Sequence, residues 1–241
     1  MIGTSDSLRG ALWMGGAVLS FSAMAIAVRQ LLAHMGPFEV LFMRSIVMLL
    51  IVLALVPRAG IALLGTRRFG LHLLRNLVHF GGQYAWVFAI GALPLATVFA
   101  IEFTMPVWTA VLASLFLKER ISFARLVMLV LGLAGVLVIL RPGFGFVHPA
   151  SFVMLAGSLA YAATLICTKR LSVTDAPLAV LFWMSVIQMP LALATSLHEW
   201  VHPTWFDLPW ILAIGIGSYT AHYCLTRAVQ IADASVVVGV D

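Results

Sequence analysis

The sequence predicts an all-α, polytopic membrane protein, and three observations support this fold class. Of the 241 residues, 63% are hydrophobic and 10% are charged. Soluble chains average about 45–50% apolar and about 25% charged residues, so a soluble domain could not bury this excess. The apolar residues fall in runs of about 20, which as helices cross ~30 Å of hydrocarbon. These runs lack the polar–apolar alternation of membrane β-barrel strands, so we expect helices.

Eight complete apolar runs follow one another along the chain, separated by short loops. They cover residues 11–32, 38–56, 70–90, 95–117, 121–140, 150–168, 178–197 and 210–229. Turn-forming Gly and Pro residues stand between several of them, as in Met35-Gly36-Pro37. A ninth run opens at Ala232, shortly before the last residue. The first run is longer than the apolar core of a typical signal peptide, which favours a membrane helix.

The positive charges predict how the helices are oriented. With the N-terminus in the cytoplasm, 11 of the 14 Lys and Arg residues fall on the cytoplasmic side, two fall outside, and Arg44 lies within a helix. The positive-inside rule therefore predicts a cytoplasmic N-terminus. The formal charge of +5 is spread too thinly for a nucleic-acid-binding patch. The two cysteines, Cys167 and Cys224, lie inside apolar runs and form no disulfide framework.

The chain contains an internal repeat at an offset of 140 residues. Between residues 13 and 53, 11 of 41 positions are identical to the residue 140 positions later, without a gap. The matches include Pro37 with Pro177 and Ser45 with Ser185, and Arg29 corresponds to Lys169. Chance would give roughly one match in ten in a chain this rich in Leu, Ala and Val.

The repeat predicts two inverted five-helix bundles. Because five is odd, the second copy begins on the opposite side of the membrane, as in many secondary transporters. We place the first repeat at residues 1–147 and the second at 148–241. Two full copies need ten helices, so we expect the second copy to be incomplete and the chain to be truncated, with a natural nine-helix variant as the alternative.

Several motifs resemble those of the drug/metabolite transporter superfamily, EamA type. They are Phe42–Ser45, Leu93–Ala96, Glu102–Pro106, Leu117–Arg120 and Gly135–Pro142. The resemblance implies a ten-helix permease that moves a small metabolite, often outward, across a bacterial inner membrane. On this basis we expect an exporter working by alternating access.

Polar residues at membrane depth predict the substrate site, because a charge near the bilayer centre costs about 2.5–3.5 kcal/mol and needs a partner or a task. Helix rise places Arg44, Gln83 and Glu102 in one layer, roughly 10–12 Å below the outer surface. A second polar cluster lies on the eighth predicted helix, residues 210–229, which the repeat relates to the third. The predicted substrate-binding residues are His79, Gln83, Tyr84, Glu102, Tyr219 and His222.

Arg44 and Glu102 are further predicted to form an ion pair, either structural or gating. Glu102 facing the cavity and binding a cation or proton is the second interpretation. Pro106 and Pro190 are predicted to kink their helices, because each removes a backbone hydrogen bond four residues back.

Two other functions stay open: a membrane-embedded lipid-modifying enzyme and a structural subunit of a membrane complex. The sequence shows no phosphate loop, zinc spacing or nucleophile–base set, so we expect no enzyme activity, cofactor or metal. The expected partners are a small-molecule substrate and the lipid bilayer. A proton or a counter-substrate, and a homodimer, stay open as well.

Overall fold

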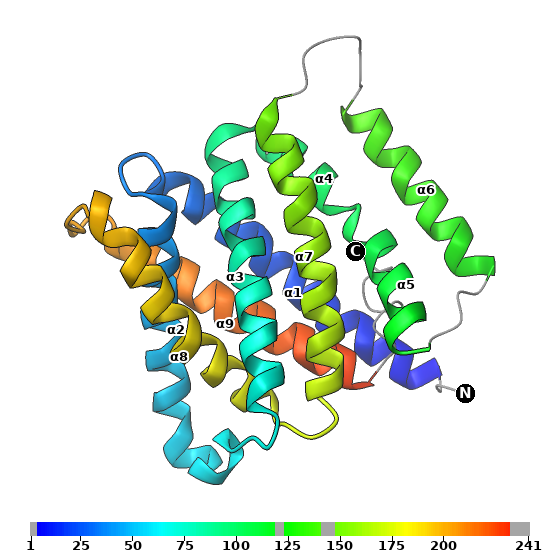
Figure 1. Cartoon of the computed structure of the whole chain (residues 1–241), viewed down its shortest axis with the longest axis horizontal. Coiled ribbons are helices and arrows are strands. Elements are labelled where there is room, and N and C mark those ends of the chain that lie inside the picture. The colour runs from blue at the N-terminus through cyan, green and yellow to red at the C-terminus, as the bar shows by residue number, and fades with distance from the viewer. Residues whose placement is uncertain (1–3, 119–122, 141–147, 232–241) are drawn as a thin grey trace.

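The computed structural model describes residues 4–118, 123–140 and 148–231, and their regular secondary structure is helical (Figure 1). All eight predicted runs correspond to helices there, the fourth as two helices. The elements are α1 (Thr4–Leu31), α2 (Pro37–Ala59), η1 (Ile61–Leu64), α3 (Phe69–Ala92), α4 (Leu95–Glu102), α5 (Met105–Phe116), α6 (Phe123–Leu140), α7 (Pro149–Leu171), α8 (Pro177–Ser196), η2 (Leu197–Glu199) and α9 (Leu208–Ile231). The ninth run expected from Ala232 lies outside the described residues.

Local sequence explains where several helices begin and end. Pro37, Pro149 and Pro177 stand in the first turns of α2, α7 and α8, where proline loses no helical hydrogen bond. Gly60 ends α2 with a φ of 93°, a conformation that favours glycine. The chain then turns through η1 into α3.

The two predicted proline kinks differ in the structure. The fourth apolar run is interrupted: α4 ends at Glu102, Phe103 and Thr104 form a turn, and α5 starts at Met105 with Pro106 in its first turn. By contrast, α8 continues through Pro190 to Ser196 as one helix.

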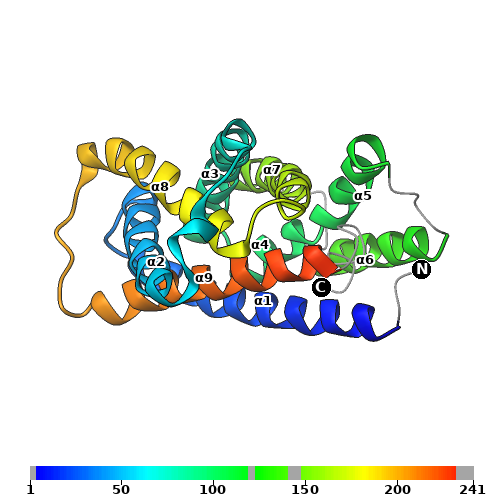
Figure 2. The same cartoon turned by 90° about the horizontal axis from the view of Figure 1, so that it is seen from below.

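The helices pack in three main pairs. Figures 1 and 2 show α1 beside α9, α3 beside α7 and α2 beside α8, and α2 also contacts α9. Small residues allow close approach at these contacts. A Cβ added to Gly157 of α7 would lie 2.9 Å from the Cβ of Ala85 on α3, and one added to Gly215 of α9 would lie 2.2 Å from the Cβ of Val47 on α2.

The chain is a multi-pass membrane protein. Among the described residues, five segments are long and apolar enough to cross a membrane: Arg9–Leu31, Pro37–Ala59, Leu95–Phe116, Pro149–Leu171 and Pro177–Glu199. Helices α3 and α9 have 24 residues each, which suffices to span the hydrocarbon, but polar side chains lower their hydropathy. These polar side chains face other helices, as the site shows.

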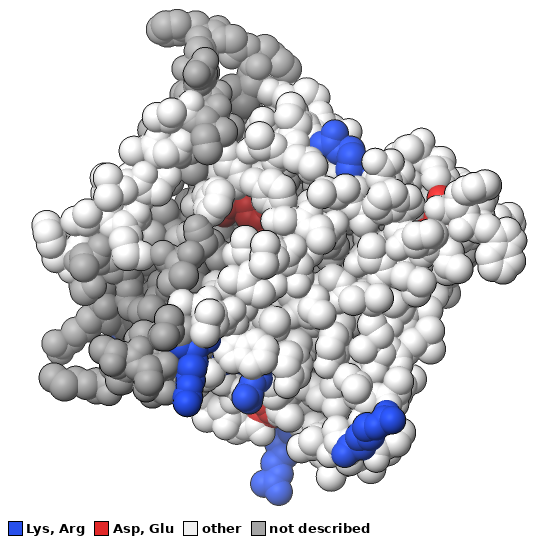
Figure 3. Space-filling model, turned by 180° about the vertical axis from the view of Figure 1, so that it is seen from behind, with Lys and Arg blue, Asp and Glu red and all other residues white. Residues whose placement is uncertain are grey.

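Basic side chains gather at one end of the bundle. On the face shown in Figure 3, most visible Lys and Arg residues lie along one edge. Hydrogen bonds join the helix ends here, since Arg68 before α3 donates to the carbonyl of Arg170 in α7 (2.9 Å) and Arg170 donates to that of Phe116 in α5 (2.6 Å). At the opposite end, Glu39 accepts from the backbone N–H of Val201 (3.2 Å).

Candidate functional site

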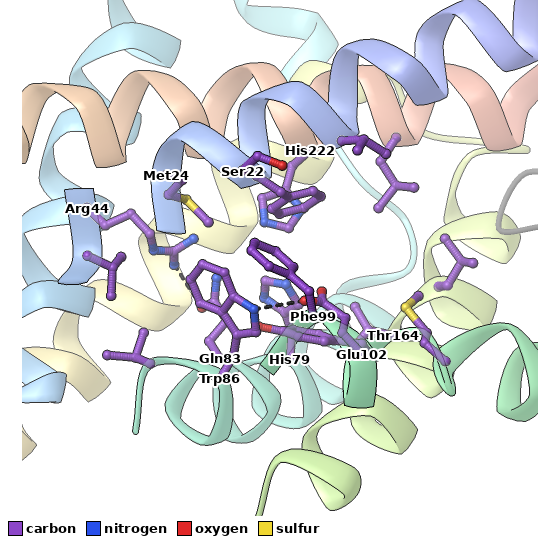
Figure 4. A pocket seen from close by; sticks show the side chains of 18 of the residues that line it. Ser22, Met24, Arg44, His79, Gln83, Trp86, Phe99, Glu102, Thr164 and His222 are labelled. Carbon is purple, nitrogen blue, oxygen red and sulfur yellow. Dashed lines mark hydrogen bonds between the residues drawn. The ribbon is translucent and has the colours of Figure 1, made fainter. Parts of the chain in front are cut away.

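A cavity of about 370 Å³ lies between α1, α2, α3, α4, α5, α7 and α9 (Figure 4). Its size is that of a small-molecule site, for which about 300–1,000 Å³ is typical. Methionine, valine, leucine and phenylalanine side chains make up half of the lining residues. A few polar side chains, described next, interrupt this apolar lining.

Arg44 connects four helices at one side of the cavity. The guanidinium, 3% exposed, donates to Ser218 Oγ of α9 (2.8 Å), Gln83 Oε1 of α3 (2.9 Å) and Gln188 Oε1 of α8 (2.8 Å). These acceptors are all neutral. Arg44 therefore holds its charge in the interior by hydrogen bonds to amide and hydroxyl oxygens.

A polar chain leads from Arg44 to a second buried arginine. The side-chain amide of Gln188 donates to Asn76 Oδ1 (3.1 Å), and Arg75 donates to that oxygen as well (2.8 Å). The Nε of Arg75 donates to Thr168 Oγ1 of α7 (3.0 Å). Arg75 is 2% exposed and lines the cavity. Gln188 and Asn76 thus link the two guanidinium groups.

Glu102 lies at the break between α4 and α5. Its Oε2 accepts a hydrogen bond from Trp86 Nε1 of α3 (2.9 Å; Figure 4). Phe99, one turn earlier on α4, and Tyr161 of α7 line the cavity as well. The carboxylate therefore lies at the C-terminal end of a half-helix, among aromatic rings.

Two histidines form the middle of the site. The rings of His79 (α3) and His222 (α9) have centroids 4.9 Å apart in an edge-to-face arrangement, and both side chains are buried. His79 Nδ1 lies 2.9 Å from Gln188 Nε2. Neither ring nitrogen of His222 has a hydrogen-bond partner among the described residues.

Four of the six predicted substrate-binding residues line this cavity: His79, Gln83, Glu102 and His222. The other two face elsewhere. Tyr84 stacks on Phe38, with ring centroids 4.6 Å apart, and Tyr219 stacks on Tyr223 at 5.8 Å. Each is one residue from a side chain that faces the Arg44 network, and one residue turns the helix by 100°, which points these rings to other neighbours.

Arg44 and Glu102, both described in the structure, do not form the predicted ion pair. The depth estimate placed both side chains in one layer, but α3 contributes a partner to each. Gln83 binds Arg44, and Trp86, three residues later on the same helical face, binds Glu102.

Arg75 lines the cavity but is not among the predicted site residues, because it was counted with the cationic residues of the cytoplasmic side. Gln188, Tyr161 and Trp86 were also left out of the predicted set. A signal was present on α3: Arg75, His79, Gln83 and Trp86 recur at helical spacing and form one polar face.

Histidine–aspartate contacts connect loops to helix starts at the two ends of the bundle. His72 Nε2 of α3 lies 2.7 Å from Asp175 in the α7–α8 loop, and His34 Nε2 in the α1–α2 loop lies 2.7 Å from Asp207 before α9. Burial raises the pKa of Asp175, but hydrogen bonds from Thr66, His72 and Thr174 outweigh it, so the pKa is lowered. The hydroxyl and N–H of Thr204 lower the pKa of Asp207.

This arrangement, an apolar helix bundle around a cavity with a few buried polar groups, is typical of polytopic membrane proteins that bind small molecules at membrane depth. The chain belongs to the EamA-like transporter family, which it matches over residues 8–141. As a transporter-family protein it is not an enzyme.

Transporters of several bacteria are similar in sequence to most of this chain. An S-adenosylmethionine uptake transporter of Rickettsia bellii is 26% identical over 223 residues, covering 92% of this chain and 77% of the relative. A riboflavin transporter of Vibrio cholerae is 28% identical, covering 95% and 79%. An uncharacterized transporter of Helicobacter pylori is 30% identical, covering 92% and 78%. A solved crystal structure shares the fold with a TM-score of 0.72 and 20% identity, covering 98% of this chain and 82% of that one.

Proposed function

We propose that this protein is a secondary transporter that carries a small metabolite by alternating access between two inverted repeats, residues 1–147 and 148–241. The observation that carries the proposal is the cavity. Its wall combines side chains of the first repeat, such as His79 and Glu102, with side chains of the second, such as Tyr161 and His222. A site shared by two repeats changes its access when one repeat rocks against the other.

The helix contacts fit an exchange of the two repeats. When the two repeats are exchanged, α1 takes the position of α7, α2 that of α8 and α3 that of α9, and the reverse. The exchange therefore converts the α1–α9 contact into the α3–α7 contact and leaves the α2–α8 contact in place, and all three are major contacts of the bundle.

Corresponding side chains support the same symmetry. Arg29 of α1 donates to the carbonyl of Leu93 at the end of α3. Its counterpart 140 residues later, Lys169 of α7, donates to the carbonyl of Val229 near the end of α9 (2.5 Å). Each cation satisfies a carbonyl at or near the C-terminal end of a helix, where positive charge is favoured.

The two histidine–aspartate contacts supply candidate gates. His34–Asp207 and His72–Asp175 each connect a helix–helix loop of one repeat to the start of a helix of the other, at opposite ends of the bundle. In an alternating cycle we expect these contacts to open in turn. The basic end of the bundle, with Arg68 and Arg170, is then the cytoplasmic side of a bacterial inner membrane.

The relatives suggest metabolites that carry a planar ring system, such as S-adenosylmethionine and riboflavin. Aromatic side chains in the wall, among them Trp86 and Tyr161, suit such rings. Export follows from the family resemblance, whereas the Rickettsia relative is named an uptake transporter. An alternating-access carrier runs either way as its gradients dictate, so the sign of the measured flux assigns the direction.

Transport by purified protein in liposomes tests the proposal. Liposomes preloaded with unlabelled S-adenosylmethionine or riboflavin should take up the labelled compound faster than empty ones, since a carrier returns faster when loaded. Thr164→Trp should abolish this exchange, because Thr164 lines the cavity and an indole would fill part of it. The matched control is Leu159→Trp on the same helix, where the side chain is 41% exposed on the outer surface.

The expected result is saturable exchange in the wild type and the Leu159→Trp variant, with loss in Thr164→Trp. Exchange by Thr164→Trp at the wild-type rate and KM would show that substrate passes elsewhere. Flux that is neither saturable nor accelerated by substrate on the far side would contradict alternating access.

A further inference from the structure

The charged groups of the cavity lack opposite charges within the protein. Among the described lining residues, the charged side chains are Arg44, Arg75 and Glu102. The described contacts pair neither arginine with a carboxylate, and Glu102 accepts from a neutral indole. Unpaired buried charges cost several kcal/mol each, so three of them around one cavity indicate that a ligand supplies the missing charges.

One wall of the cavity suits an anionic group. Arg44 and Arg75 are held in place by neutral oxygens, and the Nε of Arg44 has no partner among the described residues. His222, 4% exposed, also lines the cavity, and both of its ring nitrogens are unpartnered. Two guanidinium groups and an imidazole with free hydrogen-bonding capacity form a receptor for a carboxylate or phosphate.

The region around Glu102 suits a cationic group. The carboxylate ends α4, and the C-terminal end of a helix carries partial negative charge. Trp86 binds Oε2 and so orients the carboxylate, while Phe99 and Tyr161 contribute aromatic rings to the wall. Aromatic faces beside a carboxylate bind ammonium or sulfonium groups through cation–π attraction.

We propose that the cavity binds a zwitterionic metabolite, with its anionic group at Arg44, Arg75 and His222 and its cationic group at Glu102. This inference rests on the transport function proposed above and names its substrate class. Such a ligand neutralises the arginines and Glu102 at once, and a neutral ligand neutralises neither.

A set of four adenosyl compounds separates the two charges. S-Adenosylmethionine carries both, decarboxylated S-adenosylmethionine carries cations alone, adenosine-5′-carboxylate carries the anion alone, and 5′-methylthioadenosine carries neither. L-Methionine and L-tryptophan represent zwitterions without the adenosyl group. Dissociation constants are measured on the purified wild-type protein in detergent, so that the result does not depend on transport.

We expect a zwitterion to bind best and the loss of either charge to weaken binding about 10- to 100-fold, the effect of a hydrogen bond to a charged group. Glu102→Gln should remove the preference for S-adenosylmethionine over adenosine-5′-carboxylate. Arg75→Met should remove the preference for S-adenosylmethionine over decarboxylated S-adenosylmethionine. Glu39→Gln and Arg29→Gln change a buried carboxylate and a partly buried cation outside the cavity wall, and both preferences should survive.

Equal affinity for S-adenosylmethionine and 5′-methylthioadenosine would overturn the inference, as would the absence of binding by every zwitterion at millimolar concentration. The probe set tests the idea on the wild type alone, even if a variant fails to fold. A neutral solute whose exchange Thr164→Trp blocks would refute the zwitterion and leave the transport function standing.

Discussion

Replacing Gly215 by alanine tests the close contact between α9 and α2. The added Cβ would lie 2.2 Å from Val47 Cβ and 2.3 Å from Val47 Cγ1. Carbon atoms in contact need about 3.5 Å, so the two helices would have to separate by about 1.3 Å. A rotamer change of Val47 cannot relieve the clash, because its nearest atom is Cβ.

The expected cost is at the upper end of the range for overpacking, about 3 kcal/mol in the free energy of unfolding. For a chain of this size that corresponds to a melting temperature lower by about 6–12 °C. The assay is thermal unfolding of the purified protein in detergent, followed by tryptophan fluorescence. The matched control is Gly81→Ala on α3, where the added Cβ meets nothing within 4 Å. This control should be neutral or slightly stabilising, because alanine favours the helix.

Val47→Gly removes the clashing Cβ and provides a second test. On its own it should destabilise the protein, whereas in combination with Gly215→Ala it should recover part of the loss. A Gly215→Ala protein that melts within about 1 °C of the wild type would refute the reasoning that this glycine sets the α2–α9 distance.

Two further predictions concern single polar contacts. The lowered pKa of Asp207 means that its carboxylate stabilises the fold above an unfolded-state pKa of about 3.9 and stops doing so as pH falls through the lower folded value. The melting temperature of Asp207→Asn should therefore lie below that of the wild type at pH 6 and converge with it as the pH falls through the lowered pKa of the folded state, and a constant difference at all pH values would contradict this. Trp86→Phe removes the donor to Glu102 and should lower the free energy of unfolding by about 1.5–3 kcal/mol in thermal melts. In a Glu102→Gln background the same change should cost less, and an equal cost would show that the indole stabilises through packing alone.

Much of the fold was predictable from the sequence, because the membrane restricts the choices. Uninterrupted apolar runs of about 20 residues have essentially one solution in lipid, so the eight runs correspond to helices. The polar cluster on α3 and its counterpart on α9 were also predictable, since few polar residues occur at that depth in the sequence. His79 and His222 were placed at the same cavity for this reason.

The differences between the predicted site and the contacts in the structure share one physical cause. Counting residues from a helix end gives depth, but it does not give the direction of a side chain around the helix axis relative to its neighbours. Arg44 and Glu102 were assigned to one layer, yet α3 carries a different partner for each. Tyr84 and Tyr219 were included for their position in polar stretches and point to other aromatic rings.

The sequence by itself determined that the chain is a helical membrane protein, which of its helices are polar, and that its first two helices recur 140 residues later. These properties depend on composition and periodicity, which a bilayer converts directly into structure. The tertiary structure alone decided which polar groups meet, because contacts between helices distant in sequence depend on rotation and crossing. It buried Arg75 beside the cavity, linked it to Arg44 through Gln188 and Asn76, and left both guanidinium groups without a carboxylate among the described residues.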